Sequence, residues 1–192
     1  HVQGEPHLWS HRPAVFIVNH QSSLVDLVIT TTVLRAGFTA VVKREVADIP
    51  VFGPLLAMAD FAFIDRADAS QARDVLADAK AKLGRGVSVV ISPEGTRSYT
   101  PEVGAFKKGA FHLAQQAGVP IVPIVIRNAG ELMWRDARLA RPGRVDVVVH
   151  PPIPTSGWTK ADLDRAVVDV RDLYRKTLAS WPSGSSTVKG VQ

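Results

Sequence analysis

The sequence contains no cysteine, and this absence excludes several kinds of chemistry at once. Disulfide bonds, thiolate zinc sites and cysteine nucleophiles are impossible, and the composition is compatible with a reducing compartment. Aromatic residues are also scarce, at 7%. Because no aromatic side chains interleave with basic strands and no recognition helix is evident, nucleic-acid binding is disfavoured.

Long apolar runs are missing as well. No stretch reaches the eighteen or so apolar residues of a membrane-spanning helix, and runs such as 119–126 are short enough to be buried strands. The six histidines are scattered along the chain, so their spacing argues against a metal hydrolase, and we expect no metal site. The chain begins at His1 without a signal-peptide pattern, which favours a domain of a longer protein that could carry a further fused domain.

The residues that are present fit one compact α/β domain. The chain has 192 residues, of which 46% are hydrophobic, enough for one sizeable core but not for a second domain. Its net charge is +5. That surplus reflects either a solvated basic face or an anionic partner, such as nucleic acid, a phosphorylated substrate or an acidic membrane.

Short apolar runs alternate with stretches of helical periodicity along the chain, and several of the periodic stretches are followed by glycine. This alternation is typical of a mixed, mostly parallel sheet flanked by helices. The expected strands are 14–18, 40–42, 62–64, 87–91, 121–126 and 145–149, and the expected helices are 24–36, 72–83, 107–117 and 163–178. We expect the domain to span residues 1–180 and the Ser-, Gly- and Pro-rich residues 181–192 to form a disordered tail.

Residues 19–26, Asn-His-Gln-Ser-Ser-Leu-Val-Asp, follow the first expected strand. One interpretation is structural, with Ser23 as the helix cap and Asp26 completing a capping box. The other is catalytic, with His20 as a general base whose imidazole is oriented by Asp26, which also favours the imidazolium formed during reaction. Taken alone, this segment leaves both interpretations open.

Further segments place cations and glycine where strands end. The strand at 62–64 runs into Asp65-Arg66. This charged pair either marks the point where a strand leaves the core, or lets Arg66 bind a phosphate bidentately. Residues 93–98 read Pro-Glu-Gly-Thr-Arg-Ser, where Gly95 permits close approach of a ligand to the backbone.

Two lysines, Lys107 and Lys108, stand at the start of the next expected helix. Cations oppose the helix dipole there, which favours a bound anion over two solvated side chains. Residues 118–124, Gly-Val-Pro-Ile-Val-Pro-Ile, predict a buried strand with an edge or a bulge at its prolines.

In this order and spacing, the segments resemble the four blocks of the lysophosphatidic acid acyltransferase (1-acyl-sn-glycerol-3-phosphate acyltransferase) family of glycerolipid acyltransferases. The blocks are a histidine followed by an aspartate, a strand ending in arginine, the Pro-Glu-Gly-Thr-Arg loop and a Val-Pro strand. The resemblance covers residues 19 to 123, with the Pro-Glu-Gly-Thr-Arg-Ser stretch as its most specific part. It implies a single glycerolipid acyltransferase-like domain.

The resemblance also implies roles for individual residues. His20 and Asp26 would form the catalytic dyad, and Pro120 would shape the acceptor or acyl site. Lys43 resembles a family lysine near the phosphate, to which Lys107 and Lys108 would add charge. The glycerol phosphate itself would be bound by Arg66, Glu94, Gly95, Thr96 and Arg97.

One departure from the family concerns the spacing of the dyad. The family usually has four residues between the histidine and the aspartate, whereas five separate His20 from Asp26. An extra residue inside the helix would turn Asp26 away by about 100°. An extra residue in the preceding loop, at Ser22-Ser23, would be absorbed without that rotation.

The implied reaction moves a fatty acyl group from a thioester of coenzyme A or acyl carrier protein to the hydroxyl of a lysophospholipid. The simplest acceptor is 1-acyl-glycerol 3-phosphate, which would give phosphatidic acid, and no cofactor is expected because the thioester is a substrate. Backbone N–H groups of the 21–24 turn are candidates for stabilising the oxyanion. Glycerol 3-phosphate or another lysophospholipid as acceptor, and a non-catalytic phospholipid-binding relative, remain alternatives.

An amphiphilic acceptor and a chain without a spanning segment together predict a peripheral membrane protein, expected at the cytoplasmic face. Basic residues and the apolar segment 50–63 would contact an anionic membrane surface. The expected partners are therefore the lysophospholipid, the acyl thioester and the membrane, and not nucleic acid.

Overall fold

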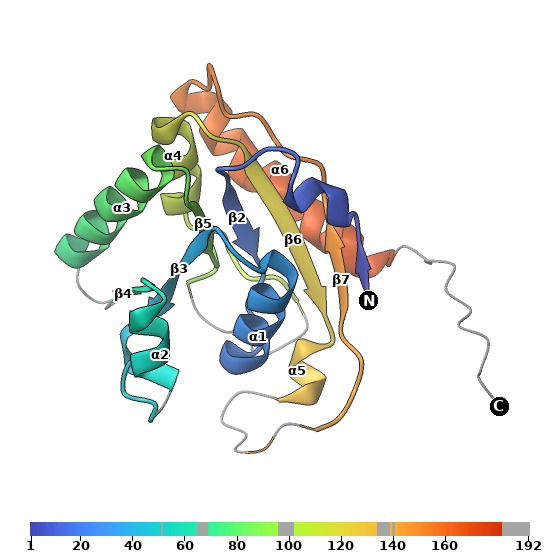
Figure 1. Ribbon diagram of the computed structural model, residues 1–192. Helices are drawn as coiled ribbons and strands as arrows, with labels where there is room; N and C mark the ends of the chain where they lie inside the picture. Colours follow the sequence, from blue (N-terminus) through green and yellow to red (C-terminus); the bar gives the residue numbers. More distant parts are fainter. Residues whose placement is uncertain (51, 65–68, 96–101, 134–138, 140, 182–192) are drawn as a thin grey trace.

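A seven-stranded sheet runs through the computed structural model, in the order β1-β7-β6-β2-β5-β3-β4 (Figure 1). The structure describes residues 1–50, 52–64, 69–95, 102–133, 139 and 141–181. The strands are β1 (Val2–Gln3), β2 (Val15–Val18), β3 (Phe38–Lys43), β4 (Ala62–Ile64), β5 (Ser88–Ile91), β6 (Ile121–Arg127) and β7 (Asp146–Val149). Among these strands β6 and β7 are antiparallel and every other neighbouring pair is parallel, so the predicted mixed, mostly parallel sheet is confirmed.

The helices cover both faces of this sheet. They are α1 (Ser23–Leu34), α2 (Phe52–Met58), α3 (Ala69–Gly84), α4 (Gly109–Ala117), α5 (Ala129–Leu132) and α6 (Lys160–Ala179), with 3-10 turns η1 (Glu5–Leu8) and η2 (Arg44–Val46). Each helix and strand expected from the sequence is present to within about three residues, the usual uncertainty of element ends. The pattern gave no signal for β1 or α5, because elements of two and four residues are too short to show a period.

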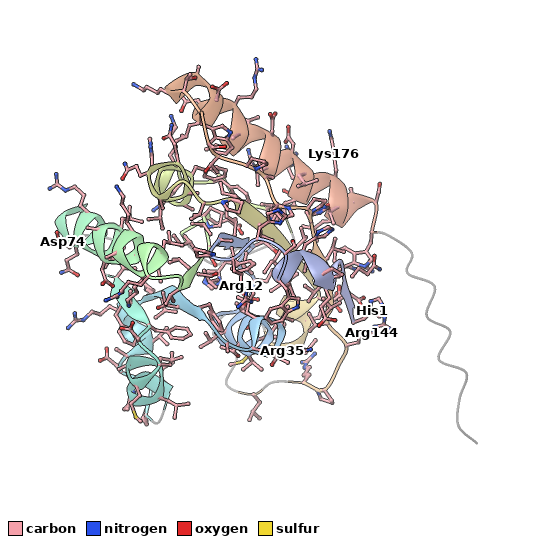
Figure 2. All side chains as sticks on the ribbon, turned by 45° about the horizontal axis from the view of Figure 1, so that its top comes forward. His1, Arg12, Arg35, Asp74, Arg144 and Lys176 are labelled. Carbon is pink, nitrogen blue, oxygen red and sulfur yellow. The ribbon has the colours of Figure 1, made fainter. Side chains whose placement is uncertain are left out.

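The central strand β2 is buried on both sides and divides the core in two. Val15 and Ile17 face the layer of α3, α4 and α6, whereas Phe16 and Val18 face the layer that includes α1 and α2. Side chains alternate between the two faces of a strand, so one short apolar run serves both cores. Figure 2 shows these two layers of side chains about the sheet, with charged groups such as Asp74 of α3 and Lys176 of α6 on the outside.

The parallel strands bring their carboxyl ends to one edge of the sheet. Ile17 lies opposite Ile91, and Lys43 opposite Ile64, so the segments that leave β2, β3, β4 and β5 emerge together. Ligands of open α/β sheets bind at such an edge. The segments from His20, Lys43 and Ser92 onward therefore begin there, although they are far apart in the sequence.

The last helix, α6, is firmly defined at its start and lies along β6 in Figure 1. Thr159 caps it: the hydroxyl of Thr159 accepts from the N–H of Asp162, and the carboxylate of Asp162 accepts from the N–H of Thr159 at 2.8 Å. This reciprocal capping box fixes the first turn. One face of α6, with Leu163, Val170 and Tyr174, is buried against the sheet and α4.

Candidate active site

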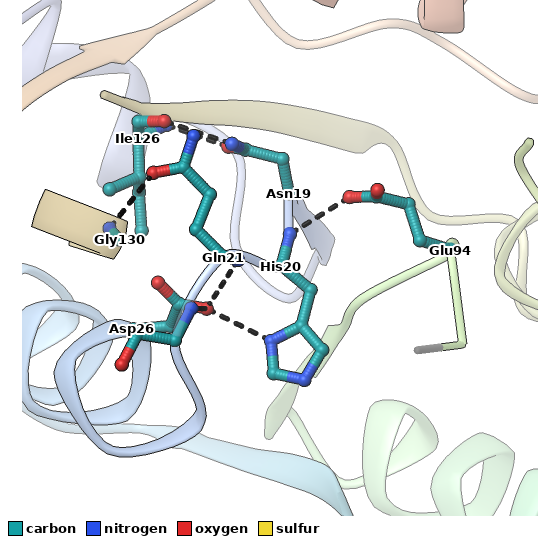
Figure 3. A network of polar contacts seen from close by, with 8 residues as sticks. Asn19, His20, Gln21, Asp26, Glu94, Ile126 and Gly130 are labelled. Carbon is teal, nitrogen blue, oxygen red and sulfur yellow. Dashed lines mark hydrogen bonds and ion pairs between the residues drawn. The ribbon is translucent and has the colours of Figure 1, made fainter. Parts of the chain in front are cut away.

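The imidazole of His20 and the carboxylate of Asp26 meet where β2 ends and α1 begins (Figure 3). His20 Nδ1 lies 2.9 Å from Asp26 Oδ2. Helix α1 starts at Ser23 with Ser22 as its N-cap, so the extra residue is absorbed in the loop and does not rotate Asp26 away. The predicted contact is confirmed. The expected Ser23 cap is wrong, because the cap position is one residue earlier and its side chain makes no capping hydrogen bond.

A single oxygen of Asp26 organises the whole turn. Besides His20 Nδ1, Asp26 Oδ2 accepts the backbone N–H groups of Gln21 at 2.9 Å and Ser22 at 2.8 Å. These two N–H groups are thus engaged, which corrects the idea that they stabilise an oxyanion. With Asp26 ionised, His20 Nδ1 carries the proton and Nε2, across the ring, remains as the base.

The other oxygen of Asp26, Oδ1, differs from Oδ2 in its hydrogen bonding. Oδ1 is buried and has no hydrogen-bond partner among the residues that the structure describes. Burial raises the pKa of Asp26 above its ordinary value, while its hydrogen bond to His20 and the charge of that ring act in the opposite direction. The carboxylate is therefore costly to keep ionised, and the imidazole is what chiefly offsets that cost.

Glu94 ties the Pro-Glu-Gly loop to the same turn (Figure 3). Its Oε1 accepts the backbone N–H of His20 at 2.8 Å, and its Oε2 accepts the N–H of Gly104 at 2.8 Å. The side chain is buried, and this burial raises the pKa of Glu94 despite the two backbone donors. These contacts let Glu94 brace the loop against the His20 turn, while the role in binding the glycerol phosphate that the resemblance implies stays a prediction.

Gly95 and Lys107 lie against each other at the edge of the sheet. Gly95 has φ +69°, and a Cβ built on it would be only 2.9 Å from Cε of Lys107. The N–H of Lys107 donates to the carbonyl of Pro93 at 2.8 Å, which holds the two segments together. Glycine is thus favoured by its backbone conformation, and its lack of a side chain leaves room for the lysine stem beside it.

Two pockets adjoin these residues. The first, about 70 Å³, is lined by His20, Asp26 and Lys43 together with apolar side chains of β3 and α1. The second, about 170 Å³, is lined by Gly95, Lys107 and apolar side chains such as Leu76 and Ile91. Both include Val41 and Ser92, so the pocket beside the base and the pocket beside the lysine are contiguous in the sheet edge.

Comparison with known proteins places the chain in a family. The family model described as Acyltransferase matches residues 1–127. This chain belongs to the acyltransferase family.

Individual relatives of this chain are also acyltransferases by name. Human 1-acyl-sn-glycerol-3-phosphate acyltransferase alpha is 38% identical over 193 residues, which cover 98% of this chain and 68% of the human protein. The coconut (Cocos nucifera) 1-acyl-sn-glycerol-3-phosphate acyltransferase is 35% identical over 168 residues, 86% of this chain. The chain spans about half of that relative's length, 54%.

The fold is likewise shared with a solved structure. The crystal structure of the 1-acyl-sn-glycerophosphate (LPA) acyltransferase from Thermotoga maritima superposes with a TM-score of 0.78 and 25% sequence identity. The match covers 96% of this chain and 73% of the other. The expected glycerolipid acyltransferase-like fold is therefore confirmed.

The three lysines predicted for the site, Lys43, Lys107 and Lys108, differ in their surroundings. Lys43, at the end of β3, lines the His20 pocket and forms an ion pair with Glu45 at 2.5 Å. Lys108 is held by Asp164 of α6 at 2.7 Å, so its ammonium is directed to that helix. The two adjacent lysines thus have different surroundings, and only Lys107 lines a pocket of the site.

The prediction that Pro120 shapes the substrate site is corrected by the topology. Pro120 immediately precedes β6, and its carbonyl accepts the N–H of Val15 at the start of β2. Because β2 and β6 are parallel, Pro120 lies at the edge of the sheet opposite to His20. Pro120 therefore leads into β6 and does not line the pocket beside His20.

Three predicted ligands, Arg66, Thr96 and Arg97, lie outside the described residues, as do residues 182–192 of the expected tail. The described residues next to them, Ile64 and Gly95, both line the second pocket. No three His, Asp or Glu side chains are grouped closely enough to hold a metal ion in the part of the chain that the structure describes.

Sequence reasoning missed residues that hold the His20 turn in place. Asn19 has its side chain clamped on Ile126, donating to its carbonyl at 2.8 Å and accepting its N–H at 2.7 Å. Gln21 accepts the N–H of Gly130 at 3.4 Å. Asn19 and Gln21 flank His20 in the sequence, and their small exposed fractions are the signal, visible only in the fold, that they hold the turn in place.

We expect Asp26→Asn to retain the fold and to change the dependence of stability on pH. A carboxyl whose folded-state pKa is raised favours the native state below its unfolded pKa, and this contribution is lost as pH rises through the folded value. Asparagine keeps one acceptor oxygen for the three donors and puts its amide in the place of unpartnered Oδ1. The melting temperature of the variant, relative to the unchanged protein, should therefore rise as the pH increases from about 4, the ordinary pKa of an aspartate.

The control is Asp164→Asn. The hydrogen bond from Lys108 lowers the pKa of the Asp164 carboxyl, so its relative melting temperature should change with the opposite sign. A constant difference across the pH range for Asp26→Asn would contradict the assigned burial cost.

Proposed function

We propose that this chain transfers a fatty acyl group from an acyl thioester to the free hydroxyl of 1-acyl-glycerol 3-phosphate, giving phosphatidic acid. The observation that carries the proposal is the 2.9 Å contact between His20 and Asp26, which line a pocket that shares Val41 and Ser92 with the pocket lined by Gly95 and Lys107. Such a site combines a general base with a cation for the acceptor's phosphate. The names of the human and coconut relatives support the same acceptor.

The proposed chemistry is direct acyl transfer. His20 Nε2 takes the proton of the acceptor hydroxyl while that oxygen attacks the thioester carbonyl. The carbon–sulfur bond then breaks, and the imidazolium returns its proton to the departing thiolate, leaving an ester and a thiol. The bond changes balance without a redox step, so no cofactor is required, and no residue carries the acyl group.

The surroundings of His20 favour the imidazolium that forms in this step. Asp26 contacts the ring directly, and the buried carboxylate of Glu94 is bound to the His20 backbone. Two carboxylates near one ring stabilise its positive charge more than the neutral form. A base placed in this way contributes about 10²–10⁴-fold to the rate.

Membrane contact is the second part of the proposal. In the described residues no helix is long and apolar enough to cross a bilayer. Helix α2 buries Leu56 in the core but exposes Leu55 by 60% and Met58 by 85%, and Ile49 before it is 42% exposed. This apolar surface follows η2, whose Val46 lines the His20 pocket. We assign it, with nearby cations such as Arg44, to a peripheral contact with an anionic cytoplasmic membrane face.

His20→Ala should abolish most turnover, with a loss of about a hundredfold or more, because the general base is removed. Acceptor binding should change little. The melting temperature should fall, because the buried carboxylate of Asp26 loses its partner, so turnover is compared per folded molecule. The measurement is acyl transfer from an acyl thioester to a panel of 1-acyl-glycerol 3-phosphate, glycerol 3-phosphate and other lysophospholipids. His112→Ala, an exposed histidine of α4, serves as control. Activity of His20→Ala within tenfold of the unchanged protein would remove His20 from the mechanism.

Lys107→Ala and Lys108→Ala form a matched pair. A charge-assisted phosphate contact contributes roughly 1.5–3 kcal/mol, so Lys107→Ala should raise the KM for the acceptor about ten- to a hundredfold. The KM for the thioester should stay nearly constant. Lys108→Ala should leave both constants almost unchanged, because Lys108 is paired with Asp164. Equal effects of the two substitutions would argue against a specific phosphate contact at Lys107.

The membrane contact can be tested by flotation with vesicles. The unchanged protein should bind anionic vesicles, more weakly as salt is added. Leu55→Ser combined with Met58→Ser should reduce binding severalfold, because about 0.8 kcal/mol is lost for each buried CH₂. Val168→Ser, which removes an exposed apolar side chain from α6, should not. Equal binding to neutral vesicles would refute the electrostatic part.

A further inference from the structure

The final helix reaches the strand that carries His20. The fully buried Tyr174 of α6 donates its hydroxyl proton to the carbonyl of Ile17 at 2.5 Å and accepts the N–H of Ile124 at 3.1 Å. In the parallel register Ile17 lies opposite Pro123, so these are the two groups that face each other across a rung of the ladder. The phenol thus bridges β2 and β6 three residues before His20.

Side-chain hydrogen bonds also fix Asn19 and His20, two and three residues after Ile17. Asn19 clamps both backbone groups of Ile126, and Glu94 accepts the N–H of His20. Beyond Ile17, the exit from β2 is therefore held by side-chain bonds in addition to the strand ladder. The position of His20 relative to the sheet depends on these three attachments, and Tyr174 is the first of them.

Tyr174 also touches the segment on the other side of the site. Its ring packs edge-on against Phe106, with 5.3 Å between the ring centroids and an interplanar angle of 82°. Phe106 lies between Gly104, which donates to Glu94, and Lys107, which lines the second pocket. One residue of α6 is thus in contact with both strands and with the segment that carries the lysine.

The hydroxyl is suited to a permanent structural bond. Burial raises the pKa of Tyr174 well above its ordinary value, so the phenol remains protonated and can keep donating to Ile17. Tyr174 is absent from the lining of both pockets and so acts from behind the site.

We propose that Tyr174 is a positioning residue for acyl transfer, whose hydroxyl fixes the end of β2 and thereby sets His20 against Asp26 and Glu94. The kinetic part of this inference rests on the proposed function. A base displaced by a fraction of an ångström loses rate without losing substrate affinity, because the substrates contact other residues.

Tyr174→Phe tests the proposal with the smallest change, since the ring and its packing on Phe106 are kept. We expect kcat to fall about tenfold to a hundredfold, with both KM values within about twofold of the unchanged protein. The decisive measurement is the same substitution in the His20→Ala background. If Tyr174 acts through His20, it should have no further effect on the residual rate there.

Val170→Ala is the matched control. Val170 lies one turn earlier on the buried face of α6 and contributes packing but no hydroxyl. Its melting temperature should fall, while kcat per folded molecule should stay within about twofold of the unchanged protein, as expected for a residue that only packs. A normal kcat in Tyr174→Phe, a loss no larger than that of Val170→Ala, or an equal loss in the His20→Ala background would overturn the proposal.

A second readout separates this inference from the proposed function. Tyr174→Phe should speed hydrogen exchange of the Ile124 amide and shift the ¹⁵N signals of the His20 imidazole, whereas Val170→Ala should leave the imidazole signals in place. Absence of acyl transfer in the unchanged protein would refute the proposed function alone. Unshifted His20 signals in Tyr174→Phe would refute the positioning role, whatever the activity.

Discussion

The candidate site depends on one oxygen atom, Oδ2 of Asp26. It accepts hydrogen bonds from His20 Nδ1 and from the backbone N–H groups of Gln21 and Ser22. The same oxygen therefore fixes both the imidazole and the backbone of the turn. The oxygen can do this only because α1 starts immediately after the turn and presents Asp26 back toward it. The sequence left two interpretations of Asp26 open, one as part of a helix cap and one as the group that orients His20. Both follow from this one arrangement.

That arrangement carries an energetic cost which its function explains. Asp26 and Glu94 are both buried, and burial raises the pKa of each, so the ionised forms oppose folding near neutral pH. Natural sites retain such groups when the charge serves the reaction. In the proposed reaction the two carboxylates lie near a ring that becomes positive as the acceptor hydroxyl is deprotonated, so their cost in stability would be exchanged for stabilisation of the reacting state.

The site is assembled by long-range attachments. Glu94 joins the glycine loop to the His20 turn, Lys107 lies over Gly95, and Tyr174 connects α6 to the strand in front of the base. Each attachment joins residues more than seventy positions apart or spans the loop that follows β5. The small pockets beside His20 and Lys107 are therefore shaped by the whole sheet edge, not by one continuous motif.

The sequence alone determined most of the strands and helices, because apolar periodicity and glycine stops are local signals. It also pointed to His20 and Asp26, because a histidine and an aspartate in one short segment are a local signal as well. It misplaced the cap at Ser23 and the site of Pro120, and it did not indicate the contacts of Glu94, Asn19 or Tyr174. Tertiary structure alone decided these: the parallel register put Pro120 at the opposite edge, and burial turned Glu94 inward to backbone donors. The hydrogen bonds of Asn19 and Tyr174 join residues 107 and 157 positions apart, so they leave no local pattern in the sequence. They can form only once the sheet has brought the two partners together.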